Sequence, residues 1–196
     1  KKWVKDQSIE NFYDEQGICH IVLPERGHLA PGIFCVGGDS HSPTGGAFGA
    51  YMFGIGATEM AGVLATGSIW IQTPETILMA WKNQLPEYVT AKDMMLAMCG
   101  KIGMGGGRYQ AIQYAGETIR SLPMQERMTL SNMAAELGAQ VGLIAPDETT
   151  IAYVEAAGGQ VPENWRDFQI ETAEEPSNII NFDATNLSPQ IAAPHS

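Results

Sequence analysis

The sequence predicts an α/β fold, with a mainly parallel layered sheet and flanking helices. Two patterns indicate this class: short apolar runs bounded by glycine or proline are typical of buried strands, and segments of helical length stand between these runs. Strands that alternate with helices at this spacing favour parallel pairing. The alternation continues to Gly159. We therefore expect an α/β domain over residues 1–159 and an extended arm over residues 160–196 that leads to a further domain.

The expected strands are short and apolar, and turn-forming or polar residues bound them. They cover residues 17–24, 32–36, 69–71, 76–81, 110–115 and 141–145, with one more at 179–182 inside the arm. The strand at 32–36 is followed by two glycines and then by Asp39, Ser40 and His41. Such a strand carries polar side chains to the C-terminal edge of a sheet, where open α/β sheets bind their ligands.

The expected helices differ in composition. They cover residues 45–67, as two buried segments broken near residues 54–56, and residues 91–99, 124–137 and 146–157, after a short helix or turn within residues 1–16. Glycine costs about 1 kcal/mol in a helix interior, so its density in the 45–67 stretch indicates that another backbone approaches closely. Thr90 with Asp93 three residues later predicts a capping box.

Composition and charge exclude several classes of function. The net charge is −11 and the chain has 11 Lys and Arg residues, which disfavours a nucleic-acid partner. No apolar run approaches the ~20 residues needed to cross a bilayer, so no membrane partner is expected. The chain begins without Met or a secretory signal, which fits a piece of a longer chain. Its cysteines form no CxxC pair, so we expect neither a disulfide framework nor a zinc ribbon, and a reducing cytoplasm is the expected compartment.

The amphipathic helix expected at 124–137 points to a chemical site. Asn132 and Glu136 are four residues apart, so they share one helix face, and a half-buried amide and carboxylate need polar partners. His20 and His41 come from regions expected to be adjacent in the sheet. We therefore expect Glu136 beside one histidine and Asp39 beside the other. Carboxylate–imidazole pairs fix the ring tautomer, as acid–base catalysis requires.

Two other interpretations of these residues stay open. A single histidine in an apolar strand, such as His20, is more often a satisfied core residue than a functional one. Alternatively, His20, His41 and Glu136 form a two-histidine–carboxylate site for one metal ion.

Several stretches together resemble the aconitase superfamily, in one collinear register over nearly the whole chain. They are Gly-Ile-Cys-His (17–20), Gly-Asp-Ser-His-Ser-Pro-Thr (38–44), Gly-Ile-Gly-Ala-Thr-Glu-Met-Ala-Gly-Val-Leu-Ala-Thr-Gly (54–67), Arg-Met-Thr-Leu-Ser-Asn-Met-Ala-Ala-Glu (127–136) and Gly-Leu-Ile-Ala-Pro-Asp-Glu-Thr-Thr (142–150). The likeness is greatest to large subunits of the 3-isopropylmalate dehydratase, homoaconitase and 2,3-dimethylmalate dehydratase type.

The resemblance implies a fold like the iron–sulfur domains of that superfamily. It also implies a hydro-lyase that isomerises a 2-hydroxy di- or tricarboxylic acid by dehydration and rehydration at a [4Fe–4S] cluster, with a small swivel-domain subunit as partner. The family's two catalytic histidine–carboxylate pairs match His20–Asp39 and His41–Glu136.

The resemblance also implies that Ser40 contacts substrate and that Asn132 faces the cluster. The family's cluster cysteines have no match, because Cys19, Cys35 and Cys99 stand in other contexts. The family's first-domain Asp–His pair, its substrate-binding arginines and its catalytic serine are also missing. We therefore expect the central part of a large subunit that alone binds no cluster and has no turnover. A non-catalytic scaffold that docks a partner through the acidic arm is the alternative.

Overall fold

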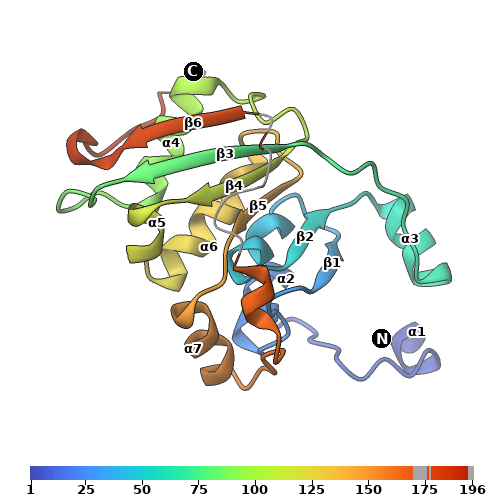
Figure 1. The fold of residues 1–196 in the computed structure, drawn as a ribbon. Coiled ribbons are helices and arrows are strands. Elements are labelled where there is room, and N and C mark those ends of the chain that lie inside the picture. Colours follow the sequence, from blue (N-terminus) through green and yellow to red (C-terminus); the bar gives the residue numbers. More distant parts are fainter. Residues whose placement is uncertain (170–175, 177, 194–196) are drawn as a thin grey trace.

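The computed structural model describes residues 1–169, 176 and 178–193, and contains two parallel sheets (Figure 1). The larger sheet has the strand order β5–β4–β3–β6, formed by Val141–Ile144, Ala111–Ala115, Thr76–Lys82 and Asn178–Asp183. The smaller sheet pairs β1 (Phe34–Gly37) with β2 (Tyr51–Gly54). Every pairing is parallel, which confirms the predicted α/β class, although the strands divide into two sheets.

Helices connect and cover these strands. The α-helices are α1 (Lys2–Asp6), α2 (Cys19–Glu25), α3 (Ala57–Thr66), α4 (Ala91–Ile102), α5 (Glu117–Ser121), α6 (Met124–Asn132) and α7 (Glu148–Ala156). Short 3-10 helices are η1 (Ser42–Phe48), η2 (Met133–Ala135), η3 (Trp165–Phe168) and η4 (Ala184–Asn186). The capping box predicted for α4 is confirmed, since the Thr90 N–H donates to Asp93 Oδ2 at 2.8 Å.

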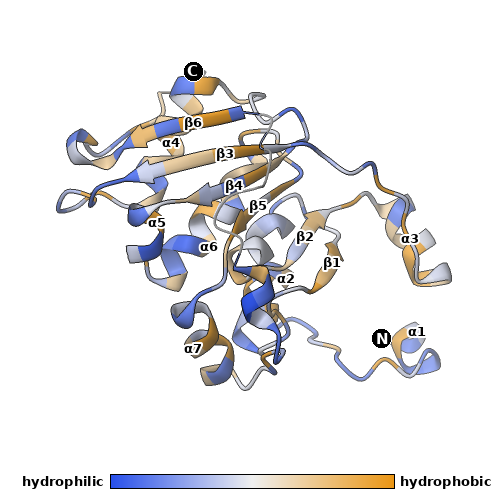
Figure 2. Ribbon diagram, viewed as in Figure 1, coloured by the Kyte–Doolittle hydropathy of each residue, from blue (hydrophilic) through white to orange (hydrophobic). Residues whose placement is uncertain are grey.

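The hydrophobic core has two parts that meet at α6. The larger part lies between the four-stranded sheet and helices α4 to α6, where Met94, Met95 and Met98 of α4 are fully buried. The smaller part joins η1 to α7, through Phe48 and Val154. Figure 2 shows hydrophobic, orange stretches in β1, β2 and β5 and in part of β6, and similar stretches in α3 and α7.

The predicted strand at residues 17–24 is wrong, because this run forms helix α2. His20, Val22 and Pro24 are buried against η1, while Ile21 is exposed. A short apolar run is compatible with either a strand or a helix, and periodicity alone does not separate them. The predicted strand at 69–71 is also wrong, since these residues form no strand and Trp70 is 85% exposed.

The glycine-rich stretch 45–67 is only partly as predicted. The break at 54–56 is confirmed, but the first segment is the end of η1 followed by β2. The second segment, α3, is helical but has no buried residue and projects from the body (Figure 1). The predicted close approach is confirmed at Gly46, where a Cβ would lie 1.8 Å from the Gly142 carbonyl oxygen. It does not occur at Gly62, which has no atom within 4 Å of that position.

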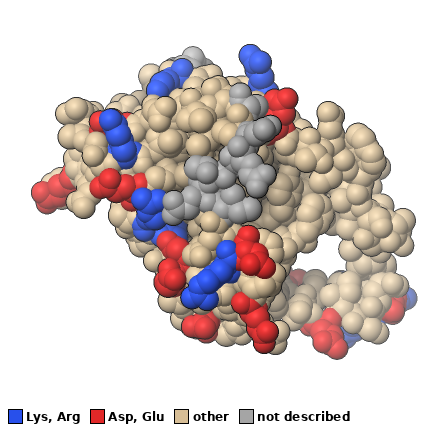
Figure 3. Space-filling view, in the orientation of Figure 1, with Lys and Arg blue, Asp and Glu red and all other residues tan. Residues whose placement is uncertain are grey.

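The predicted helix at 124–137 is shorter than expected. The α-helix ends at Asn132 and continues as η2, before Gly138 takes a positive φ of 70°. Within the expected arm, the strand predicted at 179–182 is confirmed as part of β6, which pairs with β3. Among the described residues, no helix has the length and apolar character of a membrane span. Charged side chains gather over the lower part of Figure 3, near α7.

Candidate functional site

The loop after β1 holds Asp39, Ser40 and His41 in a tight turn, as expected for polar residues that follow a strand. The Asp39 carbonyl accepts hydrogen bonds from the Ser42 N–H at 3.1 Å and from Ser42 Oγ at 2.7 Å. A Cβ at Gly54 of β2 would lie 2.5 Å from the same carbonyl oxygen. Strand β2 therefore packs closely against this loop.

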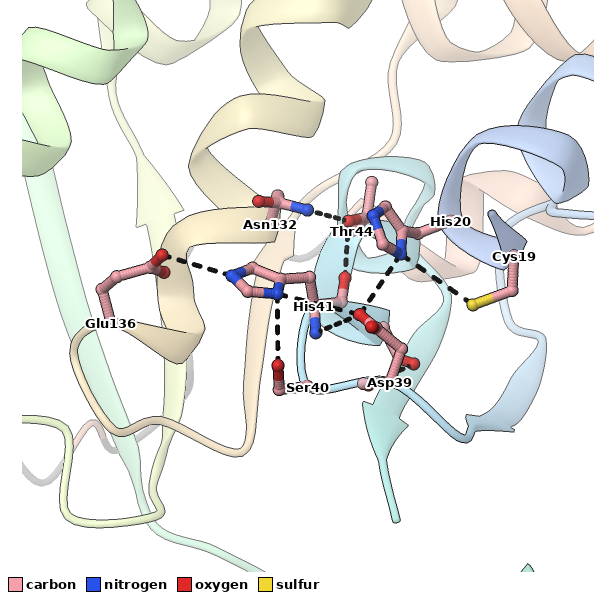
Figure 4. Close-up of polar contacts among 9 residues, drawn as sticks. Cys19, His20, Asp39, Ser40, His41, Thr44, Asn132 and Glu136 are labelled. Atoms are coloured by element: carbon pink, nitrogen blue, oxygen red, sulfur yellow. Dashed lines mark hydrogen bonds and ion pairs between the residues drawn. The ribbon is translucent and has the colours of Figure 1, made fainter. Parts of the chain in front are cut away.

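Asp39 contacts both histidines. Its Oδ1 lies 3.4 Å from Nδ1 of His20 and 3.7 Å from Nδ1 of His41 (Figure 4). The same oxygen accepts the His41 backbone N–H at 2.8 Å, which holds the carboxylate in place. His20 belongs to α2 rather than to a strand, so a helix and a loop, not two adjacent strands, bring the residues together.

Glu136 contacts the other side of His41. Its Oε1 lies 3.2 Å from His41 Nε2, and Ser40 Oγ lies 3.2 Å from His41 Nδ1. The two imidazole rings are 6.2 Å apart, measured between centroids. The structure thus brings His20, Asp39, Ser40, His41 and Glu136 into one group, and contains both predicted histidine–carboxylate contacts.

Asn132 lies beside this group but bonds elsewhere. Its Nδ2 donates to Thr44 Oγ1 at 2.9 Å, and that hydroxyl donates to the His41 carbonyl at 2.7 Å. Asn132 therefore ties α6 to η1 and, through Thr44, to the backbone of His41. Reasoning from the sequence missed Thr44, although it ends the same Gly-Asp-Ser-His-Ser-Pro-Thr stretch.

The group retains unused hydrogen-bonding capacity and faces a hollow. Glu136 Oε2 is buried and has no partner among the described residues, although the glutamate side chain as a whole is one-third exposed. His20, Thr44, Asn132 and Glu136 border a cavity of about 460 Å³. This volume lies within the usual range for small-molecule sites.

Neutral groups lie behind Glu136. Burial, and to a lesser extent the Glu136 charge, raise the pKa of the Cys99 thiol. Burial also raises the pKa of the Tyr114 phenol, with smaller contributions from Cys99 and Glu136. Both groups are therefore uncharged at neutral pH and add no negative charge beside the Glu136 carboxylate.

Comparison with protein families matches residues 1–196 to the aconitase family (aconitate hydratase). The chain belongs to the aconitase family. It is 43% identical to a probable 3-isopropylmalate dehydratase large subunit of Methanothermobacter thermautotrophicus and 44% identical to 3-isopropylmalate dehydratase large subunit 1 of Methanopyrus kandleri. It is also 43% identical to a probable methanogen homoaconitase large subunit of Methanosarcina mazei. These alignments cover 100% of this chain and 46%, 46% and 49% of the relatives, so the chain spans about half of their length.

The aconitase family generally uses a [4Fe–4S] cluster, whose irons are held by cysteine thiolates. In this aconitase-family chain, Cys19, Cys35 and Cys99 are free, and they lie on α2, β1 and α4. Over residues 1–169, 176 and 178–193, no three His, Cys, Asp or Glu side chains are grouped to hold a metal ion. The chain's cysteines therefore do not fit as a ligand set for the cluster. Among the described residues, His20, His41 and Glu136 are not grouped to hold a metal ion either, so the alternative single-metal site is wrong.

Proposed function

We propose that this chain is the central part of an aconitase-family hydro-lyase large subunit of the 3-isopropylmalate dehydratase type. Its substrate would be a 2-hydroxy di- or tricarboxylic acid, isomerised by dehydration and rehydration. The observation that carries the proposal is the pair of histidine–carboxylate contacts, each of which contributes one residue, His20 or Glu136, to the same hollow. A homoaconitase or 2,3-dimethylmalate dehydratase large subunit is the alternative within the same chemistry.

The reaction needs an acid and a base on the two sides of a carbon–carbon bond. Dehydration removes a proton from the carbon beside the one that bears the hydroxyl, while the hydroxyl leaves as water; rehydration reverses both transfers. Two histidines whose ring centroids are 6.2 Å apart, with Asp39 beside His20 and Glu136 beside His41, supply two proton-transfer groups.

The carboxylates select the tautomer of each ring. Glu136 accepts Nε2–H of His41, which leaves Nδ1 of His41 to accept the Ser40 hydroxyl. This hydrogen bond orients the Ser40 side chain. Asp39 accepts Nδ1–H of His20, which leaves Nε2 to exchange a proton with a ligand in the hollow. In this proposal Ser40 contacts the substrate, and Asn132 lines the hollow beside it.

Two parts of the whole enzyme, the cluster and a second subunit, lie outside this chain in the proposal. The [4Fe–4S] cluster of the parent enzyme would be held by residues that the chain does not contain. A small swivel-domain subunit would complete the site, a partner suggested by the "large subunit" names of the relatives. We also propose that residues 1–159 correspond to one iron–sulfur domain of the family, and that residues 160–196 lead to the next.

The test is an anaerobic assay of a full-length large subunit that carries this sequence, together with its small subunit. We expect turnover of 3-isopropylmalate, and weaker or no turnover of homocitrate, 2,3-dimethylmalate and citrate. The absorbance of the alkene product measures the rate. The matched control is the 196-residue chain alone after reconstitution with iron and sulfide. It should show neither turnover nor the charge-transfer absorbance of a cluster; a stable brown holoprotein would contradict the proposal.

A scaffold role is the second candidate, favoured by charge. Residues 147–196 contain nine acidic residues and one basic residue, Arg166. If this segment docks a partner without catalysis, the chain should co-purify with a small subunit of ~20 kDa while the Glu136→Gln substitution leaves the activity of the complex unchanged.

A further inference from the structure

The hollow that His20, Asn132 and Glu136 border is also lined by Lys92 of α4 and by Gln125 and Thr129 of α6. The Ala91 N–H donates to Glu126, so Lys92 lies near the start of α6, whereas Asn132 ends that helix. Gln125, Thr129 and Asn132 are spaced by four and three residues, so they lie along one face of α6. Seven residues of α-helix span roughly 10 Å, which is the separation of Gln125 and Asn132 along the helix axis.

Lys92 is the only lysine or arginine among the described residues that line this hollow. Its side chain is exposed and makes no hydrogen bond or ion pair with any residue that the structure describes. Other lysines do have partners: Lys82 contacts Asp183, and Lys101 donates to the Asn181 carbonyl. The Lys92 ammonium group is thus an unneutralised cation at the edge of a small-molecule cavity.

Two acidic groups at the start of α4 are already engaged. Asp93 accepts the Thr90 N–H through Oδ2 and the Gln190 N–H through Oδ1. Burial raises the pKa of Asp93, but these hydrogen bonds outweigh it and keep the pKa below its usual value. Glu126 accepts the Ala91 N–H at the start of α4. Both carboxylates are therefore held on backbone amides.

We propose that Lys92 binds a carboxylate of the substrate, while the hydroxyl-bearing end of the substrate lies at His20 and Asn132. This inference rests on the proposed function, because it takes the hollow to be the substrate pocket. A dicarboxylate suits the arrangement, since the pocket has a cation at one end and proton-transfer groups at the other. An ammonium–carboxylate contact is charge-assisted, and such contacts are about twice as strong as neutral hydrogen bonds.

The test measures binding of L-malate, the unsubstituted 2-hydroxy dicarboxylate, to the 196-residue chain by NMR titration. The ring signals of His20 and the side-chain amide of Asn132 report on the pocket. In Lys92→Gln the Kd for malate should rise about tenfold or more, as expected for loss of a hydrogen bond to a charged group. Lys92→Arg should keep the Kd within a few-fold. Lys5→Gln, which changes the net charge equally at an exposed position of α1, should leave the Kd unchanged.

The matched ligand is 2-hydroxybutanoate, in which a methyl group replaces the second carboxylate. Its Kd should be the same for the unsubstituted chain and for Lys92→Gln, because the group that Lys92 contacts is gone. If Lys92→Gln binds malate as tightly as the unsubstituted chain does, the role of Lys92 is wrong and the proposed function is untouched. If malate leaves His20 and Asn132 unperturbed in the unsubstituted chain, the hollow is not the substrate pocket and the role of Lys92 is wrong, whereas the proposed function is decided separately by the assay of the full-length enzyme.

Discussion

Two charged groupings lie against α6, one near each end, and they are built differently. Near the start, Arg127 is fully buried and contacts Asp147 through both terminal nitrogens at 2.7 Å. Its Nε and Nη2 also donate to the carbonyls of Leu122 and Arg120 at 2.9 Å. Past the other end, His41 and Glu136 share one contact of 3.2 Å and each keeps about a third of its side chain exposed. The first grouping is saturated, whereas the second retains capacity for a ligand.

This difference separates structural from functional use of charge. Arg127 joins α6 to the end of α5 and to the N-cap residue of α7, Asp147. Burial raises the pKa of Asp147, but the hydrogen bonds and charge of Arg127 more than offset this and hold the pKa below its usual value. Perturbed carboxylates therefore mark architecture as well as function, and unsatisfied groups at a hollow are the more informative sign.

The largest expected effect comes from breaking the saturated grouping. Arg127→Met should lower the free energy of unfolding by about 3–5 kcal/mol, because it leaves Asp147 and two carbonyls without their partner. Urea unfolding monitored by circular dichroism measures this. His41→Asn is the matched control in the other grouping and should change the stability by less than about 1 kcal/mol. Equal losses in the two variants would remove the distinction.

Activity should show the reverse order. In the full-length enzyme with its small subunit, Glu136→Gln should lower kcat by about 100-fold or more, because His41 loses the carboxylate that fixes its tautomer. The unfolding free energy should stay within about 1 kcal/mol of the unsubstituted value. Steady-state kinetics and urea unfolding on the same preparation test both statements. Full activity of Glu136→Gln would refute the assigned role.

A smaller effect is expected from the packing of η1, which carries Thr44. Gly46→Ala places a Cβ against the Gly142 carbonyl of β5, so η1 must shift, at a cost of about 1–3 kcal/mol. Gly62→Ala, in the exposed interior of α3, is the control and should stabilise the chain by about 0.5–1 kcal/mol. Thermal unfolding gives both values. A neutral Gly46→Ala would mean that η1 adjusts freely and does not fix the loop of His41.

The smallest effect is the pH dependence of the Arg127–Asp147 pair, because a quarter of the Asp147 side chain is exposed. The folded-state pKa of Asp147 is lowered, so its contribution is fully present above the unfolded pKa of about 3.9 and is lost as the pH falls through the lower, folded value. The stability gap between the unsubstituted chain and Asp147→Asn should narrow over that acidic range. A gap independent of pH below 4 would contradict the assignment.

Much of the site could be predicted from the sequence because its signals are local. The glycines after β1 and the consecutive Asp39, Ser40 and His41 indicate where polar groups emerge, and the two histidine–carboxylate contacts are present in the structure. Their catalytic roles stay a prediction. The strand predicted at His20 is wrong, but its predicted partner is present, since His20 contacts Asp39 from helix α2.

Other features could not be predicted because long-range packing decides them. Nothing in the sequence marks the end of α6 at Asn132. Asn132 and Glu136 still border one hollow, but they bond to separate partners, Thr44 and His41. The structural role of Arg127 could not be predicted, since its carbonyl and carboxylate partners meet only in the folded chain. The exposure of α3 could not be predicted either, because its apolar composition is typical of a buried helix.

The position of β6 has a consequence for the order of folding. Ile77 of β3 pairs with Asn178, so this flank of the sheet waits for a segment about one hundred residues later in the chain. Contacts this distant form slowly, and an unpaired strand invites association with other chains. During synthesis β3 would stay open until residue 183 has left the ribosome, and a chain cut after residue 159 would keep that edge open. Such a truncated chain should aggregate where the longer one remains dispersed.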